Sequence, residues 1–182
     1  MNRPSRTRLA AVAGALLLSA TAVGSAIAAD SSADAPLAKE PALTGSAKMY
    51  RYSGDTVHFA FDAHGAGQKA QGTFRFSHRF VQGGGASAEG RIDCLISGGK
   101  VAVATGIVTK TDKPGLKGKR VGFTVSDEGK GRRDRLGYSW PITNDPAVMK
   151  DVPKCLSSAP YEIVESGDFQ VARWEPQPLP RG

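Results

Sequence analysis

The stretch GRIDCLISGGKVAVATGIVT, residues 90–109, contains the strongest fold signal in the chain. Two apolar runs flank Gly98-Gly99, and a glycine pair favours a type I′ turn because both central residues of that turn need positive φ. If these two glycines form the loop, Cys94 lies opposite Val103 and on the same face as Ile96. The stretch therefore predicts an antiparallel hairpin with Cys94 on its apolar side, next to the core.

Other segments alternate apolar and polar residues with a period of two, which is typical of half-buried strands. They are TVHFAFDA (56–63), GTFRFSH (72–78), RVGFTVSD (120–127) and YEIVESGDFQVARW (161–174). In the last of these, Tyr161 and Ile163 are expected on the apolar face, followed by Phe169 and Val171 after a turn or bulge at Gly167. The pattern gives about eight short strands joined by short turns.

Many short strands and almost no helix favour an all-β fold, a single antiparallel barrel-like domain, with a β-sandwich as the alternative. One short helix is predicted in NDPAVMKDVP, residues 144–153, where Asp145 is a suitable N-cap, Pro146 fits the first helical position and Pro153 ends the helix. This segment would deliver Cys155 to the core just before the last strands.

Residues 1–28 have the features of a secretory signal peptide. Arg3, Arg6 and Arg8 precede an apolar run, and small residues end it before Ala29. Removing this segment changes the charge balance from 24 basic against 17 acidic residues to 21 against 17, or +4. So mild an excess does not indicate a nucleic-acid partner. We therefore expect a secreted protein with no transmembrane segment after signal removal.

Composition divides the rest of the chain into three parts. Residues 29–47 lack periodicity and are interpreted as a flexible leader, residues 48–174 as the β domain, and residues 175–182, with three prolines, as a disordered tail. Cys94 and Cys155 are the only cysteines. In an oxidising compartment such a pair forms a disulfide, which over about 60 residues contributes about 4 kcal/mol on the chain-entropy estimate.

The segment SDEGKGRRDR, residues 126–135, joins two predicted strands and mixes acids, glycines and arginines. Its basic residues stand where a calcium loop needs oxygen ligands, and it leads to a strand where a phosphate cradle needs a helix. It is interpreted as a polar hairpin loop in which Asp134 caps backbone donors or pairs with an arginine. The alternative is a surface loop that binds anions, and its candidate residues are Asp127, Lys130, Arg132, Arg133, Asp134 and Arg135.

Four aromatic residues could line a pocket at a barrel mouth, although such residues more often plug the barrel end. They are Tyr138, Trp140, Tyr161 and Trp174. The histidines lack zinc spacing, and His58 and His78 are placed away from the phenylalanine faces of their strands. We predict no metal, no cofactor and no catalytic residues, and we leave open whether the protein is an enzyme.

Several motifs together resemble a known group of proteins. They are Gly72-x-Phe74-x-Phe76, Gly90-Arg91-Ile92-Asp93-Cys94-Leu95, Gly106-x-Val108, Phe123-Thr124-Val125-x-Asp127-x-Gly129 and Asp134-Arg135. This pattern resembles small secreted β-rich proteins of actinobacteria, a group with no assigned active residues. The resemblance implies a secreted β module from a Gram-positive, high-GC bacterium, and it implies no chemistry.

The leading hypothesis is a non-enzymatic binding or cell-envelope interaction module. Its partner would be an anionic cell-wall polymer or a small apolar ligand held in the barrel. One alternative is a small hydrolase or isomerase with a barrel-mouth site around Ser139, Asp134 and Trp140. The other is an inhibitor of a secreted enzyme, because exposed loops on a disulfide-linked scaffold present a rigid epitope.

Overall fold

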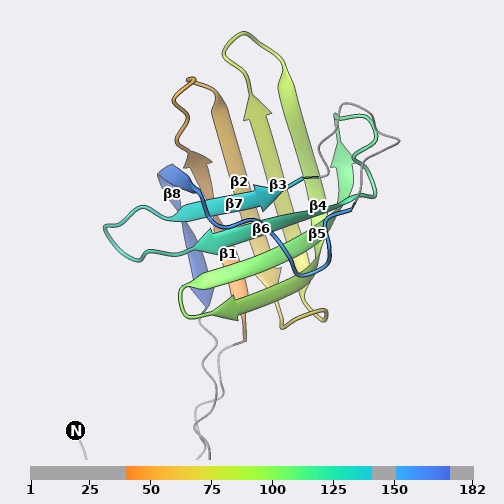
Figure 1. The fold of residues 1–182 in the computed structure, drawn as a ribbon, viewed down its shortest axis with the longest axis vertical. Helices are drawn as coiled ribbons and strands as arrows, with labels where there is room; N and C mark the ends of the chain where they lie inside the picture. The colour runs from red at the N-terminus through yellow and green to blue at the C-terminus, as the bar shows by residue number, and fades with distance from the viewer. Residues whose placement is uncertain (1–39, 141–150, 173–182) are drawn as a thin grey trace, which may run out of the picture. The chain divides into compact units, whose positions relative to one another are not determined.

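The computed structural model describes residues 40–140 and 151–172, and these form a closed antiparallel barrel (Figure 1). Each strand pairs with its neighbour in the chain, and β8 returns to pair with β1. The strands are β1 (Ala42–Met49), β2 (Thr56–His64), β3 (Gln71–Arg79), β4 (Gly85–Gly98), β5 (Val101–Thr111), β6 (Arg120–Ser126), β7 (Arg135–Ser139) and β8 (Glu162–Ala172). The barrel prediction is confirmed, and the pairing of β1 with β8 rules out the open sandwich.

Phenylalanine rings fill the centre of the barrel. Phe59 and Phe61 of β2 point inward by the predicted alternation, and both lie within 6.0 Å of the Phe123 ring from β6. Phe74 lies 4.9 Å from Phe123, and Phe169 lies 5.5 Å from Phe61. Since an eight-stranded barrel has an interior just wide enough for side chains to fill, this ring cluster is the core.

Strand β1 begins at Ala42, inside the segment predicted to be a flexible leader, so the start of the ordered domain was predicted too late. Leu43 and Met49 are fully buried. Gly45 interrupts the alternation; only glycine fits there, because φ is 114° and a Cβ would lie 2.3 Å from the Asp168 carbonyl oxygen of β8. Gly45 thus lets β1 pair closely with β8, and it also weakens the alternating pattern by which the strand could have been predicted.

The β4–β5 hairpin forms, but its turn lies one residue later than predicted, which moves each cross-strand partner by two residues. Gly98 pairs with Val101, and the turn residues are Gly99 and Lys100. Of these two only Gly99 has positive φ, 55°, which fits a type II′ turn and not the expected type I′ turn. This register places Cys94 opposite Thr105, and a bulge between Ile92 and Cys94 then puts these two residues on opposite faces of the strand.

Cys94 therefore lies on the outer face of the barrel, where the prediction had placed it beside the core. Leu95 and Ala104, which pair with each other, belong to the interior core, whereas Ile96 is half exposed. Cys94 is still fully buried because its disulfide partner, Cys155, comes from a segment that covers the outer face. The predicted disulfide is confirmed, with a Cα–Cα distance of 5.4 Å.

That covering segment, residues 151–161, runs across the outer face of β6 and β7, and we call it the strap (Figure 1). Two glycines let it lie close: a Cβ at Gly122 would stand 2.4 Å from the Leu156 carbonyl oxygen, and one at Gly137 would stand 1.9 Å from the Ala159 carbonyl oxygen. Every residue of β6 after Arg120 is buried. This part of the wall thus has protein on both faces.

No helix forms within residues 40–140 and 151–172, and accordingly none there is long and apolar enough to cross a membrane. The predicted short helix falls mostly on residues 141–150, outside the described residues, and residues 151–153 are not helical. The predicted signal peptide, most of the predicted leader, Trp174 and the tail also lie outside the described residues.

Candidate functional site

The β6–β7 loop projects from the barrel (Figure 1), and its base is fixed by Asp134. This carboxylate is 2% exposed. It accepts hydrogen bonds from the backbone N–H of Glu128 (2.9 Å) and from that of Phe169 in β8 (2.8 Å). Burial raises the pKa of Asp134, and the two hydrogen bonds partly oppose that rise. Asp134 thus caps backbone donors, one of the two roles predicted for it.

Asp127 ties the other side of the loop to β8. Its Oδ1 accepts from the Gly129 N–H (2.9 Å), and its Oδ2 accepts from the Val171 N–H (3.1 Å). The next residue, Glu128, accepts hydrogen bonds from the Lys100 ammonium and the Ser126 hydroxyl, which lower the pKa of its carboxyl group. All three acids near the loop base therefore bind groups of the protein itself.

The basic residues of the loop divide into two sets. Arg135 turns back toward the barrel and donates to the carbonyl oxygens of Pro160 (3.1 Å) and Tyr161 (3.2 Å) in the strap. Lys130, Arg132 and Arg133 are exposed at what we call the loop tip, residues 129–133. Only Arg132 among these three makes an ion pair within the described residues, with Glu128 at 3.1 Å.

The aromatic residues predicted at a barrel mouth meet there, apart from Trp174, which is not described. Tyr138 lies 5.6 Å from Tyr161 and 6.4 Å from Trp140, and its ring is 5.4 Å from Phe59. Trp140 in turn packs against Phe76 at 4.7 Å. Tyr138 and Trp140 thus extend the interior ring cluster to the barrel end, and this packing is that of a plug.

A charged cluster that the sequence did not reveal adjoins this plug. The Arg51 guanidinium contacts Glu162 Oε1 at 2.7 Å and donates to the Tyr138 hydroxyl at 3.0 Å, while that hydroxyl donates to Glu162 Oε1 at 2.9 Å. Arg51 Nε and Glu162 Oε2 are buried without a hydrogen-bond partner among the described residues. The pKa of Tyr161 is raised, mainly because its ring is partly buried and secondly because of its hydrogen bond with Tyr138.

The faces at the start of β8 are opposite to those predicted. Glu162 and Val164 are buried, whereas Tyr161 is 51% exposed and Ile163 39% exposed. The reason is the Arg51 side chain, which compensates the Glu162 charge and lets a carboxylate occupy an inward position. Apolar periodicity carries no information about such a partner, which lies far away in the sequence.

His78 was also predicted on the wrong face. It shares the inward face of β3 with Phe74 and Phe76, is half-buried, and bonds to Asp55 through Nε2 at 3.0 Å. His58 is exposed, as expected. The described residues contain no group of three or more His, Cys, Asp or Glu that could hold a metal ion.

The residues proposed for a barrel-mouth hydrolase are not brought together. Asp134 precedes the first residue of β7 and Ser139 is the last, so about 16 Å of strand separates them. The Ser139 hydroxyl accepts from the Ser158 N–H at 2.9 Å, a contact that holds the strap. Neither residue has the other as a catalytic partner.

No protein-family model matches the chain, and neither a curated protein nor a solved structure shows significant similarity to it. The resemblance to secreted actinobacterial proteins thus stays a prediction.

Proposed function

We propose that this protein is a non-enzymatic binding module that acts outside the cytosol and uses its loop tip to bind an anionic cell-wall polymer. The observation that carries this proposal is the sorting of charge in the β6–β7 loop. Asp127, Glu128 and Asp134 accept hydrogen bonds at its base, while Lys130, Arg132 and Arg133 are exposed. A sequence of mixed charge thereby presents a cationic surface to solvent.

The anchored base favours binding by this loop. Because Asp127 and Asp134 hold both sides of the loop to β8, less conformational entropy is lost when a partner orders the tip. Arginine and lysine both bind phosphate and carboxylate groups, arginine through its planar fork. The disulfide supports an oxidising compartment, where such a polymer would be met.

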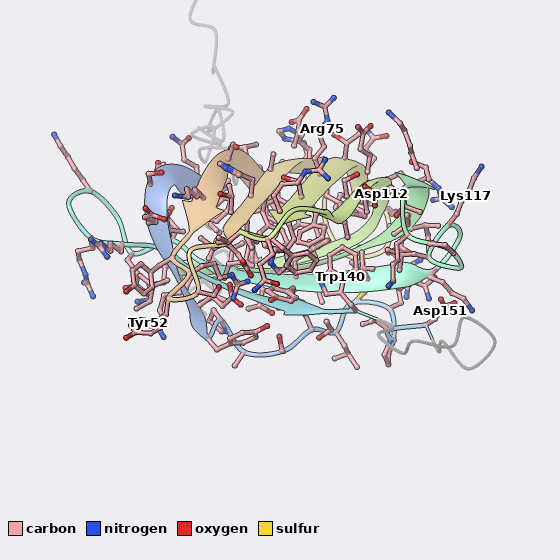
Figure 2. The ribbon with its side chains drawn as sticks, turned by 90° about the horizontal axis from the view of Figure 1, so that it is seen from above. Tyr52, Arg75, Asp112, Lys117, Trp140 and Asp151 are labelled. Atoms are coloured by element: carbon pink, nitrogen blue, oxygen red, sulfur yellow. A yellow bond between two sulfur atoms is a disulfide. The ribbon has the colours of Figure 1, made fainter. Side chains whose placement is uncertain are left out.

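A charge-matched pair of double variants tests the proposal. Lys130→Gln/Arg133→Gln removes two tip charges, and Lys113→Gln/Lys117→Gln removes two exposed charges from the β5–β6 loop at the other end of the barrel, where Figure 2 shows Lys117. Co-sedimentation with purified wall, before and after its anionic polymer is stripped, measures binding. We expect the tip variant to bind about tenfold more weakly, about 1.4 kcal/mol, and the control to change less than twofold.

Binding should also weaken with added salt, since exposed charge pairs are screened. Equal losses in the two variants would show that total charge, and not the loop tip, controls binding. Unchanged binding to stripped wall would remove the anionic polymer as the partner.

The two other versions of the hypothesis have less support. An apolar ligand inside the barrel would have to displace Phe59, Phe61, Phe74, Phe123 or Phe169, all of which are buried there. A hydrolase at the barrel mouth has less support because, among the described residues, Ser139 and Asp134 are far apart along β7 and the Ser139 hydroxyl binds the strap. The apolar-ligand version would regain support if native mass spectrometry of the secreted protein showed an extra mass that is lost on denaturation.

A specific observation favours the inhibitor hypothesis as the second candidate. Tyr52 and Val81, 97% and 67% exposed, extend from the neighbouring β1–β2 and β3–β4 loops. Asp55 links these loops by accepting from the Val81 N–H (3.2 Å) and bonding to His78. If these two loops bind a secreted enzyme, the wild type should capture that enzyme from culture fluid and inhibit it. The Tyr52→Ser/Val81→Ser variant should do neither.

A further inference from the structure

The outer face of β1–β4 carries a hollow of about 240 Å³. Small side chains make its floor, because Ser46, Ala60 and Ser77 lie where the sheet could have carried long ones. Arg75 and His58 stand beside them on β3 and β2. Figure 2 shows Arg75 on the outer side of the sheet, away from Trp140 and the interior. The hollow is thus separate from the barrel core and from the β6–β7 loop.

The polar groups around this hollow are free to bind a ligand. Within the described part of the chain, no hydrogen bond or ion pair engages the side chains of Arg75, His58, Ser46 or Ser77. Elsewhere on the same outer face, Lys48 is paired with Glu165 at 3.0 Å. Four polar side chains without a partner among the described residues therefore meet at a place where small side chains leave room.

The acid in the hollow does not neutralise Arg75. Glu89 lies opposite Arg75 in the strand register, but its carboxylate contacts Lys110 on the far side, at 3.6 Å. The Ser87 hydroxyl donates to Asp112 and keeps acceptor capacity toward the hollow. The site thus offers a free guanidinium, with hydroxyls and a paired carboxylate that suit ligand hydroxyl groups.

We propose that this hollow is a second binding site, for a hydroxyl-bearing oxyanion of about the size of one sugar unit. The guanidinium of Arg75 binds the carboxylate or phosphate in a charge-assisted, bidentate contact. The volume is below the roughly 300 Å³ at which pockets for drug-sized ligands begin, so it takes one small unit and not a chain. The inference does not depend on the loop tip.

Amide NMR titration of the isotopically labelled protein tests the site. The probes are glucuronate and glycerol 3-phosphate, which supply the two kinds of oxyanion, with glucose and glycerol as neutral controls. We expect shifts confined to the amides of β1–β4 around Ala60, Ser77 and Ser87, saturating at a dissociation constant of about 1 mM for at least one of the anions. The anion that binds more tightly identifies the source chemistry.

Arg75→Gln should weaken that binding at least tenfold, whereas Arg91→Gln, an equal charge change at an exposed position on β4, should alter it less than twofold. Ser77→Leu, which fills the floor without changing charge, should abolish binding while the amide spectrum stays folded. Equal effects of Arg75→Gln and Arg91→Gln, equal shifts with the neutral probes, or no shifts with either anion would each overturn the proposal. The Lys130→Gln/Arg133→Gln variant should bind these probes like the wild type, so the two sites fail independently.

Discussion

Replacing Asp134 by alanine should destabilise the protein much more than replacing an exposed aspartate that accepts the same number of hydrogen bonds. In the wild type, the two Asp134 oxygens accept the N–H groups of Glu128 and Phe169. Both donors lose their partner in Asp134→Ala. Because the carboxylate is 2% exposed, bulk water does not take its place.

The expected magnitude follows from the two donors. A buried donor left without a partner costs about 1–3 kcal/mol, which gives about 2–6 kcal/mol for the pair. A water in the space left by the carboxylate would offset part of this cost, and the removal of a buried charge would offset a further part. We therefore expect a loss of about 3 kcal/mol in the free energy of unfolding.

Asp112→Ala is the matched control. Asp112 also accepts two hydrogen bonds, from the Ser87 N–H (2.7 Å) and the Ser87 hydroxyl (2.8 Å), but it is exposed and water can replace it. Its loss should cost less than about 1 kcal/mol. Urea unfolding followed by tryptophan fluorescence measures both variants. If the two losses were equal, burial of the Asp134 bonds would not be what stabilises the loop base.

Three further predictions concern the strap and pH. Gly137→Ala should destabilise by about 1–3 kcal/mol by pushing Ala159 away, whereas Gly98→Ala, with nothing within 4 Å of the new Cβ, should be nearly neutral in the same urea unfolding assay. The Cys94→Ala/Cys155→Ala variant, which opens a cross-link over 61 residues, should lose about 4 kcal/mol, and proteolysis should then cut the strap before the barrel; a strap as resistant as in the wild type would contradict this. Asp134 has a raised pKa, so its protonation adds stability that is fully present below pH 3.8 and lost as pH rises through the raised value. The wild type should therefore be more stable relative to Asp134→Asn at pH 3.5 than at pH 7, and a difference that does not vary with pH would refute the raised pKa.

The sequence predicted the strands whose pattern is local. In β2, Val57, Phe59 and Phe61 alternate with polar residues, and this period alone places them inside the barrel. The disulfide was predictable because two cysteines allow one pairing. Residues 126–135 were correctly predicted to form a loop between two strands. The structure is compatible both with a polar hairpin loop and with a surface loop that binds anions.

What the sequence could not predict depends on distant partners. Cys94 was assigned to the inner face because nothing local marks the bulge beside it, or shows that the strap covers the outside. Glu162 faces inward only because Arg51 meets it. The hollow depends on register, since Ser46, Ala60 and Arg75 come from three strands and align only after the barrel has closed.

The pairing of β1 with β8 determines where an attachment to either end of the domain would lie relative to the β6–β7 loop. Ala42 and Ala172 are register partners, so the chain enters and leaves the domain side by side. Asp127 and Asp134 bond to β8 near that exit, and the loop tip therefore belongs to the same end. An attachment made through either strand would therefore stand beside the base of this loop, and its size would limit the directions from which a large partner can reach the tip.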